Sequence, residues 1–543
     1  MITGSAFLPA PAHRQEGGAS DRLARDRCMK LNTVLEGVEI REVIGETQRE
    51  IEGIAYHSGH VKPGFLFVAL RGQEVDGHRF IPDALERGAE TVVVERMEGL
   101  SGSRRATVVR VTNSRQALAH IATNFYGHPS SKMTLIGVTG TNGKTTTTFL
   151  LESMLKKAGF RVGVVGTINT RYGETMIQAV NTTPESLDLQ RVLSEMAKSG
   201  VSHVIMEVSS HGLDLDRVLG CQFDLAVFTN FTSDHLDYHQ TLEHYFQSKR
   251  KLFAHYLATS PKPKRFAITN GDDPKGEAIV RGCNVPVVRY GLKSLGEVSA
   301  DPITSTFEGL TCRIRTPQGE FDVHSKLIGG YNLYNILAAV SAGIAMDLPN
   351  PVLKEGIEAV ERVAGRFEKV ENQKGINVIV DYAHSQDALE RVLSGLRSVL
   401  SDAFRGSSAI GKVITVFGCG GDRDRTKRPL MGEVAGKYSD LCILTSDNPR
   451  TEDPVAIMEE AEKGLRTLNL KKWRPDEISL WRSAKGYLSI ADRREAIRTA
   501  IRLAQPSDTV LIAGKGHEDY QILGKKKFPF DDRVEARKAL EEA

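Results

Sequence analysis

The chain has 543 residues, more than a single hydrophobic core usually serves, so two to four domains are expected. A composition of 40% hydrophobic and 26% charged residues excludes fibrous and fully disordered proteins. The 71 basic and 68 acidic residues leave a net charge of +3, which argues against nucleic acid as a partner and leaves room only for local anion-binding pockets.

The sequence predicts a cytoplasmic protein without membrane insertion. No apolar run reaches the roughly 18 residues of a membrane span. Six scattered cysteines form no C-x-x-C pair and are expected to be reduced. Residues 1–28 have no apolar core of a secretory signal, and their acidic residues count against a transit peptide. We expect a disordered extension there, ahead of a fold that begins near Met29.

The first block, from about Thr33 to Ser130, has short and mixed signals. Gly64–Leu70 and Thr91–Val94 are apolar and β-branched and predict strands, and a helix is expected to start at Asp83 between them. This block is therefore predicted to be a mixed α/β domain.

A second block begins at Met133. The apolar stretch Leu135–Val138 leads into a glycine- and threonine-rich loop and then into a helical pattern from Thr145 to Ala158. Further strands are expected at Val162–Val165, Val204–Met206 and Leu225–Phe228. Alternating strands and helices predict an α/β domain with a mostly parallel sheet.

A third block begins near Val363, and each of its strands runs directly into a polar loop. The strands are expected at Val378–Val380, Val413–Phe417, Leu441–Leu444 and Thr509–Ile512. The loops are Asp381–His384, Gly418–Arg428, Asp447–Arg450 and Gly514–Glu518. Ligands of open α/β sheets bind at the carboxyl ends of strands, so these loops predict one shared site.

A phosphate-binding loop is predicted between the first strand and helix of the second block. Its residues are Gly140, Thr141, Asn142, Gly143, Lys144, Thr145 and Thr146. Glycines let backbone N–H groups turn toward phosphate oxygens, Lys144 can neutralise the outer phosphates, and a threonine hydroxyl can reach Mg²⁺. The usual pattern needs glycine where this chain has Val138. The alternative, a glycine-rich turn without a ligand, is disfavoured by the strand–loop–helix context.

An acidic residue at the next strand end is the candidate metal ligand. Glu207 ends the strand Val204–Met206, where a carboxylate can meet the phosphate-bound cation. Polar residues around it include Ser209, His211, Asn230, Asp234, His235, Asp237 and His239. A zinc site at His211, His235 and His239 is the competing hypothesis, and the lack of cysteine partners and of H-E-x-x-H spacing disfavours it.

These motifs resemble the Mur ligases, and within them the UDP-N-acetylmuramoyl-tripeptide synthetases. The matching segments are Gly140–Thr146, Asn181–Pro184, Met206–His211 and Asp234–His239. The resemblance implies three α/β domains. They are a mixed α/β UDP-binding domain at 29–131, a central P-loop ATPase domain at 132–362 and a C-terminal Rossmann-like amino-acid-binding domain at 363–543.

The resemblance also implies the residues that hold the nucleotide-linked substrate, UDP-N-acetylmuramoyl-L-alanyl-D-glutamate. They match Ser58, Gln73, Glu74, Val75, Asn181, Thr182, Thr183, Ser209, Arg217 and Lys249. The chain departs from the family pattern at two places. It has His57-Ser58-Gly59 where relatives often have Asp-Ser-Arg, and Leu215 where some have a binding Gln.

Further positions match residues of the family's ATP site. Lys249 aligns with a carbamylated lysine, and a desolvated amine that adds CO₂ would become an anionic metal ligand. Asn332, Asn335, Arg366, Asp381 and His384 match positions near ATP. The resemblance implies Thr145 and Glu207 on one Mg²⁺, and Glu207, His235 and carbamylated Lys249 on a second. Lys144, Glu207, His235 and Lys249 are therefore the expected catalytic residues.

The amino acid to be added is expected to be meso-2,6-diaminopimelate. The matching residues are Arg423, Asp447, Asn448, Pro449, Arg450, Gly514 and Glu518. Diaminopimelate carries a second carboxylate that a guanidinium can grip with two hydrogen bonds, whereas the ammonium of lysine would be repelled by Arg450. A surface arginine in a turn is the alternative for Arg450.

The implied function is ATP-dependent ligation of diaminopimelate to the D-glutamate γ-carboxylate through an acyl phosphate. It serves peptidoglycan synthesis, and with it cell wall biogenesis, cell shape, cell division and the cell cycle. ATP and Mg²⁺ are the expected cofactors, and a monomer is expected. No residue stands out as the general base, and no function is assigned to 470–489. The alternatives are a lysine-adding homologue, a folylpolyglutamate synthetase and a degenerate P-loop scaffold that binds nucleotide without turnover.

Overall fold

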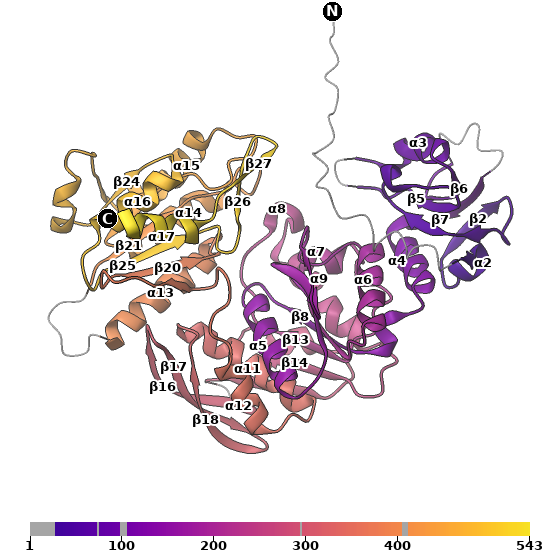
Figure 1. Ribbon diagram of the computed structural model, residues 1–543, viewed down its shortest axis with the longest axis horizontal. Coiled ribbons are helices and arrows are strands. Elements are labelled where there is room, and N and C mark those ends of the chain that lie inside the picture. Colours follow the sequence, from indigo (N-terminus) through magenta and orange to yellow (C-terminus); the bar gives the residue numbers. More distant parts are fainter. Residues whose placement is uncertain (1–27, 73–74, 98–105, 294–295, 404–410, 543) are drawn as a thin grey trace, which may run out of the picture. The chain divides into compact units, whose positions relative to one another are not determined.

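The computed structural model describes residues 28–72, 75–97, 106–293, 296–403 and 411–542 (Figure 1). The described chain separates into two compact units. The first comprises the residues up to Pro129 together with Glu185–Glu195 and Leu215–Cys221, and the second comprises the rest. The extension expected at residues 1–28 lies almost wholly outside the described residues. Within those described, no helix is both long and apolar enough to cross a membrane.

The first unit is built on a five-stranded sheet in the order β2-β7-β6-β5-β4. Four strands are parallel, and β2 pairs antiparallel with β7. The strands are β2 (Ile40–Ile44), β4 (Gly53–Ala55), β5 (Phe65–Val68), β6 (Ala89–Val94) and β7 (Thr107–Val111), and the helices are α2 (Leu31–Val34), α3 (Ile81–Glu86) and α4 (Ser114–Phe125). Successive residues of β5 face opposite cores, one beneath α4 and one beneath α3, so both sheet faces are buried.

The second unit contains an eleven-stranded sheet whose centre is parallel, as predicted. Its parallel strands are β9 (Val162–Val165), β12 (His203–Glu207), β8 (Thr134–Thr139), β13 (Leu225–Phe228), β14 (Phe266–Asn270), β15 (Val287–Gly291) and β16 (Val298–Thr306). Antiparallel strands extend both edges: β10 (Asn169–Tyr172), β11 (Thr175–Gln178), β17 (Gly309–Thr316) and β18 (Gly319–Ser325). These edge strands were not predicted from the sequence.

Helix α5 (Lys144–Lys157) is the next element after β8, and the phosphate loop connects the two. Its apolar residues pack with α11 (Gly330–Ala345) and α12 (Asn350–Glu358) into one core with the sheet (Figure 1). Strands β12 and β13 flank β8, so the residues that follow all three strands emerge at the same sheet edge. The phosphate loop, Glu207 and the segment after Phe228 are thereby brought together.

A second sheet in the same unit has the order β19-β20-β25-β21-β22-β24-β23, with only β19 antiparallel. Its strands are β19 (Glu368–Val370), β20 (Asn377–Asp381), β21 (Val413–Phe417), β22 (Leu441–Leu444), β23 (Lys471–Lys472), β24 (Gly486–Ser489) and β25 (Thr509–Ala513). Helices α13 (Gln386–Ala403), α14 (Lys427–Tyr438) and α15 (Pro454–Thr467) share one core, and α16 (Arg493–Leu503) and α17 (Asp532–Glu542) share the other. The stretch 470–489 supplies the two edge strands β23 and β24.

A fully buried ion pair connects α16 and α17 beneath the end of β25. Both side chains are 0% exposed. Arg493 donates to the two carboxylate oxygens of Asp532 at 2.8 and 2.7 Å and to the carbonyl of Ala513 at 2.9 Å. The pair therefore supports the backbone immediately before Gly514.

Arg493→Met is expected to lower the free energy of unfolding of this domain by about 3–5 kcal/mol, because it leaves the Asp532 carboxylate buried without a partner. The measurement is scanning calorimetry. Arg498→Met is the matched control, since that arginine lies on the same helix in half-exposed pairs and its loss should change stability far less. Equal effects of the two substitutions would contradict the assignment.

Candidate functional site

A cavity of about 590 Å³ lies in the second unit at the carboxyl ends of its central strands. A cavity of this size holds a small-molecule ligand. Its lining includes Thr141–Thr146, Thr167, Thr182, Glu207, Ser209, Asn230–Thr232, Asp234, His235, Asn335, Arg366 and Asp381–Ser385. Most residues predicted from the phosphate-loop and strand-end motifs therefore share one cavity.

Two glycines of the phosphate loop are required by close packing. Gly140 has φ +146°, and a Cβ there would lie 1.9 Å from Thr229 Oγ1. Gly143 has φ +87°, and a Cβ there would lie 2.3 Å from Asn335 Oδ1. Because no side chain fits either position, the loop backbone stays open toward the cavity, as a phosphate cradle requires.

Two lysines donate to the same backbone carbonyl. Lys144 Nζ donates to Gly140 O and Thr141 O, both at 2.9 Å. Lys249 Nζ, on α9 (Leu242–Lys251), also donates to Gly140 O at 2.9 Å and is 1% exposed. Burial lowers the pKa of Lys144, and burial together with the charge of Lys144 holds the pKa of Lys249 well below its usual range. Burial therefore favours the neutral amine form of Lys249.

The predicted oxygen ligands of a cation are in direct contact. Glu207 is 2% exposed, and its Oε2 accepts hydrogen bonds from Thr145 Oγ1 and Thr167 Oγ1, both at 2.9 Å. Its Oε1 accepts from the Thr167 amide at 3.0 Å. A carboxylate beside two hydroxyls is a donor set that fits Mg²⁺, which prefers oxygen. Thr167 carried no motif and was missed in the sequence.

His235 begins the short helix α8 (Leu236–His239) with a left-handed backbone, φ +54°. Desolvation lowers the pKa of its imidazole despite the neighbouring Asp234, so the ring is neutral and one nitrogen keeps a lone pair. Its ring centroid lies 5.9 Å from that of Tyr245, which also packs under the Lys249 amine. A neutral imidazole can offer this lone pair to a cation.

Residues from the segment before the second sheet and from its first strand complete the cavity. Arg366 donates to Thr145 Oγ1 at 3.2 Å and lies over the ring of Tyr382. Burial raises the pKa of Asp381 to about 6, and its carboxylate accepts from the Phe367 amide at 2.7 Å. His384 donates through Nδ1 to the carbonyl of Tyr382, and burial lowers its pKa. These groups therefore present one cation and one neutral imidazole to the phosphate loop.

Two further contacts refine the predicted nucleotide residues. Asn332 does not line the cavity, because its amide donates to Ile328 O at 2.7 Å and its Oδ1 accepts from Asn335 Nδ2 at 2.9 Å. It orients Asn335, which does line the cavity. Asp387, missed in the sequence, accepts from Asn142 Nδ2 at 2.8 Å and from Thr232 Oγ1 at 2.9 Å. No motif marks it, since its partners are distant in sequence.

The residues predicted for the nucleotide-linked substrate fall in both units. In the second unit, Thr182 and Ser209 line the cavity, the Thr183 hydroxyl lies 3.1 Å from that of Ser209, and Asn181 is exposed. In the first unit, Ser58 is buried, Val75 is half exposed, and Arg217 pairs with Glu185 at 3.5 Å. Gln73 and Glu74 lie outside the described residues.

The predicted diaminopimelate residues gather where β22 and β25 end. Asn448 Nδ2 donates to Glu518 Oε2 at 2.9 Å, and a Cβ on Gly514 would lie 2.9 Å from Asp447 Oδ2. Arg450 has φ +52° and donates to Gly421 O at 2.7 Å. Burial, and then the nearby charge of Arg423, lower the pKa of Arg450.

A buried lysine that the sequence did not single out supports these acids. Lys515 is 0% exposed, and its amine lies 3.0 Å from Glu518 Oε2 and 3.7 Å from Asp447 Oδ1. The site thus gathers two guanidiniums and two carboxylates, and the Lys515 amine lies beside both acids.

Comparison with known families matches nearly the whole described fold. The Mur ligase middle domain matches residues 138–343, the Mur ligase glutamate ligase domain 365–516, and the Mur ligase family catalytic domain 50–126. Proteins named UDP-N-acetylmuramoyl-L-alanyl-D-glutamate–2,6-diaminopimelate ligase from Geobacter metallireducens and Geobacter sulfurreducens are 48% and 46% identical. The alignments cover 95% and 94% of this chain and 99% and 98% of theirs. The chain belongs to the Mur ligase family.

Solved structures agree with this assignment. A structure of a UDP-N-acetylmuramoyl-L-alanyl-D-glutamate–2,6-diaminopimelate ligase is 30% identical, with a TM-score of 0.64 over 95% of this chain and 99% of that one. A D-alanyl-D-alanyl-adding ligase from Acinetobacter baumannii, 19% identical with a TM-score of 0.60, shares the fold over 90% of this chain and 95% of its own. The family and the α/β fold class predicted from the motifs are confirmed.

Substitution of Lys144 tests the phosphate loop of this Mur ligase. Lys144→Ala is expected to lower ATP turnover by about 100- to 1,000-fold, because it removes a preorganised cation from the loop. Release of ADP is the measurement. Lys157→Ala, an exposed lysine at the other end of α5, is the matched control and should leave turnover unchanged. Normal turnover in Lys144→Ala would remove this role.

Proposed function

We propose that this Mur ligase joins meso-2,6-diaminopimelate to the D-glutamate γ-carboxylate of UDP-N-acetylmuramoyl-L-alanyl-D-glutamate, with conversion of ATP to ADP and phosphate. The observation that carries the proposal is the charge arrangement at the ends of β22 and β25. Arg423 and Arg450 lie close together there, and Asp447 and Glu518 lie near Arg450. The relatives described above are named for this same activity.

Diaminopimelate matches that arrangement because each of its ends carries one ammonium and one carboxylate. A guanidinium pair can hold the distal carboxylate by parallel hydrogen bonds, while the carboxylates accept from an ammonium. Lysine has no distal carboxylate, so its binding would leave the half-buried Arg450 guanidinium beside Arg423 without an anion to neutralise the pair. The charge pattern therefore favours diaminopimelate over lysine.

Activation of the acceptor substrate rests on charge neutralisation. The glutamate carboxylate and the triphosphate repel one another, and Lys144, Arg366 and the loop amides lower that repulsion and hold the reacting oxygens in line. The γ-phosphoryl passes to the carboxylate, the amine attacks the acyl phosphate, and phosphate leaves. Mg²⁺, held by Thr145 and Glu207 and at a second position by Glu207, His235 and Lys249, would supply further positive charge. The general base is not assigned.

Lys249 is proposed to be carbamylated. A neutral, buried amine is the form that reacts with CO₂, releasing one proton as the N–C bond forms. The product is an anion beside the Lys144 ammonium, so repulsion between two amines at Gly140 O becomes attraction. His235 and Glu207 would then share a cation with the carbamate.

The remaining parts of the proposal follow from the substrates. We infer domain limits of 29–131, 132–362 and 363–543, a monomeric state, and a cytoplasmic place of action where ATP and nucleotide-linked precursors occur. Through peptidoglycan synthesis the activity would serve cell shape and cell division.

Amino-acid-dependent ADP release tests the proposed function. With the UDP-linked dipeptide and ATP, diaminopimelate should support turnover, and lysine should not. Arg450→Ala should raise the diaminopimelate KM by about 10- to 100-fold, since one charged hydrogen-bonded contact contributes about 1.5–3 kcal/mol. Arg474→Ala, an exposed arginine away from β22, is the control. Turnover with lysine but not with diaminopimelate would favour the lysine-adding homologue. Turnover with a folate substrate would favour the folylpolyglutamate synthetase. Nucleotide binding without any turnover would favour the non-catalytic P-loop scaffold.

Lys249→Ala tests the carbamate. The variant should lose most activity because a metal ligand is missing, and added short carboxylates such as acetate should restore part of it by filling the vacated space. Lys251→Ala, two residues further along α9, is the control, because this half-exposed lysine lies beside Asp214 and makes no contact with Gly140 O. Mass spectrometry under CO₂ should show the modified lysine in the parent protein. Full activity of Lys249→Ala would refute the assignment.

A further inference from the structure

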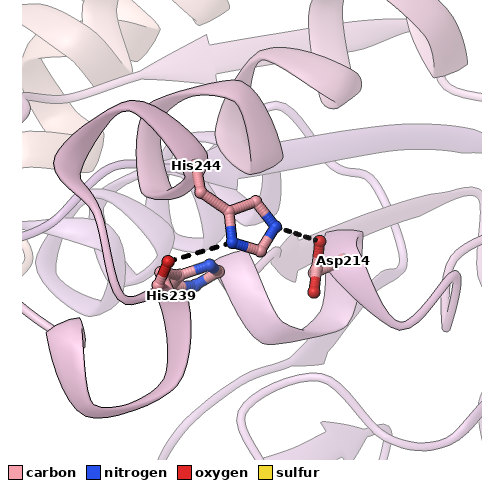
Figure 2. A group of neighbouring side chains, drawn as sticks. All are labelled: Asp214, His239 and His244. Atoms are coloured by element: carbon pink, nitrogen blue, oxygen red, sulfur yellow. Dashed lines mark hydrogen bonds and ion pairs between the residues drawn. The ribbon is translucent and has the colours of Figure 1, made fainter.

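Three side chains from three helices converge next to the reaction cavity without lining it (Figure 2). Asp214 ends α7 (Ser210–Asp214), His239 ends α8, and His244 lies in the first turns of α9. One oxygen or nitrogen from each of the three lies within 4.8 Å of the others. The neighbours of this triad decide what can occupy the space between the three atoms.

His244 is held so that its second nitrogen faces a carboxylate. Its Nδ1 lies 3.0 Å from the backbone carbonyl of His239, and its Nε2 lies 3.1 Å from Asp214 Oδ1. A carbonyl oxygen only accepts, so Nδ1 carries the proton. In the neutral ring Nε2 then presents a lone pair to an anionic oxygen. That contact is repulsive unless a cation, either a proton or a metal ion, lies between the two atoms.

His239 supplies a second nitrogen that could bind a metal ion. The residue is 1% exposed, and its Nε2 lies 3.0 Å from Ser210 Oγ. Its Nδ1 is buried and has no hydrogen-bond partner among the described residues. Burial, followed by the charge of His211, lowers the pKa of His239 to about 4, so the ring is neutral at physiological pH. With Nε2–H donating to the serine, Nδ1 is left with a free lone pair.

We propose that Asp214, His239 and His244 form a transition-metal site distinct from the Mg²⁺ positions of the reaction, with Zn²⁺ as its occupant. Two imidazoles and one carboxylate are a ligand set of zinc, whereas Mg²⁺ prefers oxygen alone. The Ser210 hydroxyl provides the outer hydrogen bond that metal-bound histidines usually make. His244 is 49% exposed, which leaves a fourth position for water.

Neighbouring donors and cations compete with a metal ion for the Asp214 carboxylate. Asp214 also accepts from Tyr238 Oη at 2.8 Å and Ser248 Oγ at 3.3 Å, and Lys251 Nζ lies 3.7 Å away. Burial alone would raise the pKa of Asp214, but these donors and charges lower it, so the carboxylate is ionised. Lys251 is 40% exposed and can turn into water when a metal ion arrives. A proton on His244 and the Lys251 ammonium are therefore the two competitors.

An occupied site would tie together the segments that carry the proposed reaction residues. Helix α8 begins after His235, and Lys249 lies one turn beyond His244 on α9. The ion would fix these helices without taking part in phosphoryl transfer. The proposal does not depend on the proposed function, because metal binding is measured directly.

The first test is metal titration of the full-length protein after treatment with a chelator. Zn²⁺ is followed by calorimetry and Co²⁺ by its visible absorption, in the presence of MgATP to occupy the reaction cavity. We expect one stoichiometric site whose affinity rises with pH, since the metal displaces a proton. Absence of such a site at mildly alkaline pH would show that a proton alone occupies the gap, and would overturn the proposal.

Matched variants locate the site. His244→Ala should weaken binding by more than the 10- to 100-fold typical of losing an outer partner, and Ser210→Ala by about that amount. His255→Ala, an exposed histidine beyond α9, and His235→Ala, at the reaction cavity, should bind as the parent does. Lys251→Met should tighten binding by about tenfold, because it removes a competing cation, and misfolding cannot produce that gain. Unchanged affinity in His244→Ala, or loss of binding in His235→Ala, would overturn the proposal.

Discussion

The shared carbonyl of Gly140 is the constraint on which the reaction cavity depends. Two lysine amines, from α5 and α9, donate to this one oxygen, and Arg366 reaches Thr145 on the same loop. Cations this close and this buried are unfavourable unless an anion joins them or one amine gives up its proton. The cavity is thus organised in advance for anions.

Sheet topology explains why these groups meet. Parallel pairing of β12, β8 and β13 brings the residues after each strand to one edge of the sheet. The phosphate loop, Glu207 and the His235 loop therefore lie close together. The second sheet repeats this arrangement with β20, β21, β22 and β25. One edge carries the phosphate-loop motif, and the other carries guanidiniums and carboxylates.

Strand-end loops are the part of the site that the sequence predicts well. Gly140–Thr146 and Asp447–Arg450 stand out because apolar strands precede them and because glycine, lysine and arginine have few other reasons to occur there. Thr167, Asp387 and Lys515 escaped prediction for a physical reason. Thr167 and Asp387 act through distant partners, Glu207 and Asn142, so no local spacing marks them. Lys515 contacts the nearby Glu518, but its contact with Asn448 spans 67 residues of sequence. The edge strands β17 and β18 do alternate buried and exposed residues, a strand pattern that the prediction omitted.

Three site residues adopt a strained backbone conformation, which costs free energy but positions their side chains. His235, Phe367 and Arg450 all adopt left-handed φ values near +50°, which non-glycine residues rarely do. Each conformation costs on the order of 1 kcal/mol or more and persists only where the surroundings enforce it. The Asp381 carboxylate holds the Phe367 amide at 2.7 Å, and Ile522 O holds the Arg450 amide at 3.1 Å. At His235 the helices α8 and α9 perform this task, and a metal ion on Asp214, His239 and His244 would reinforce them where the cavity needs a fixed imidazole.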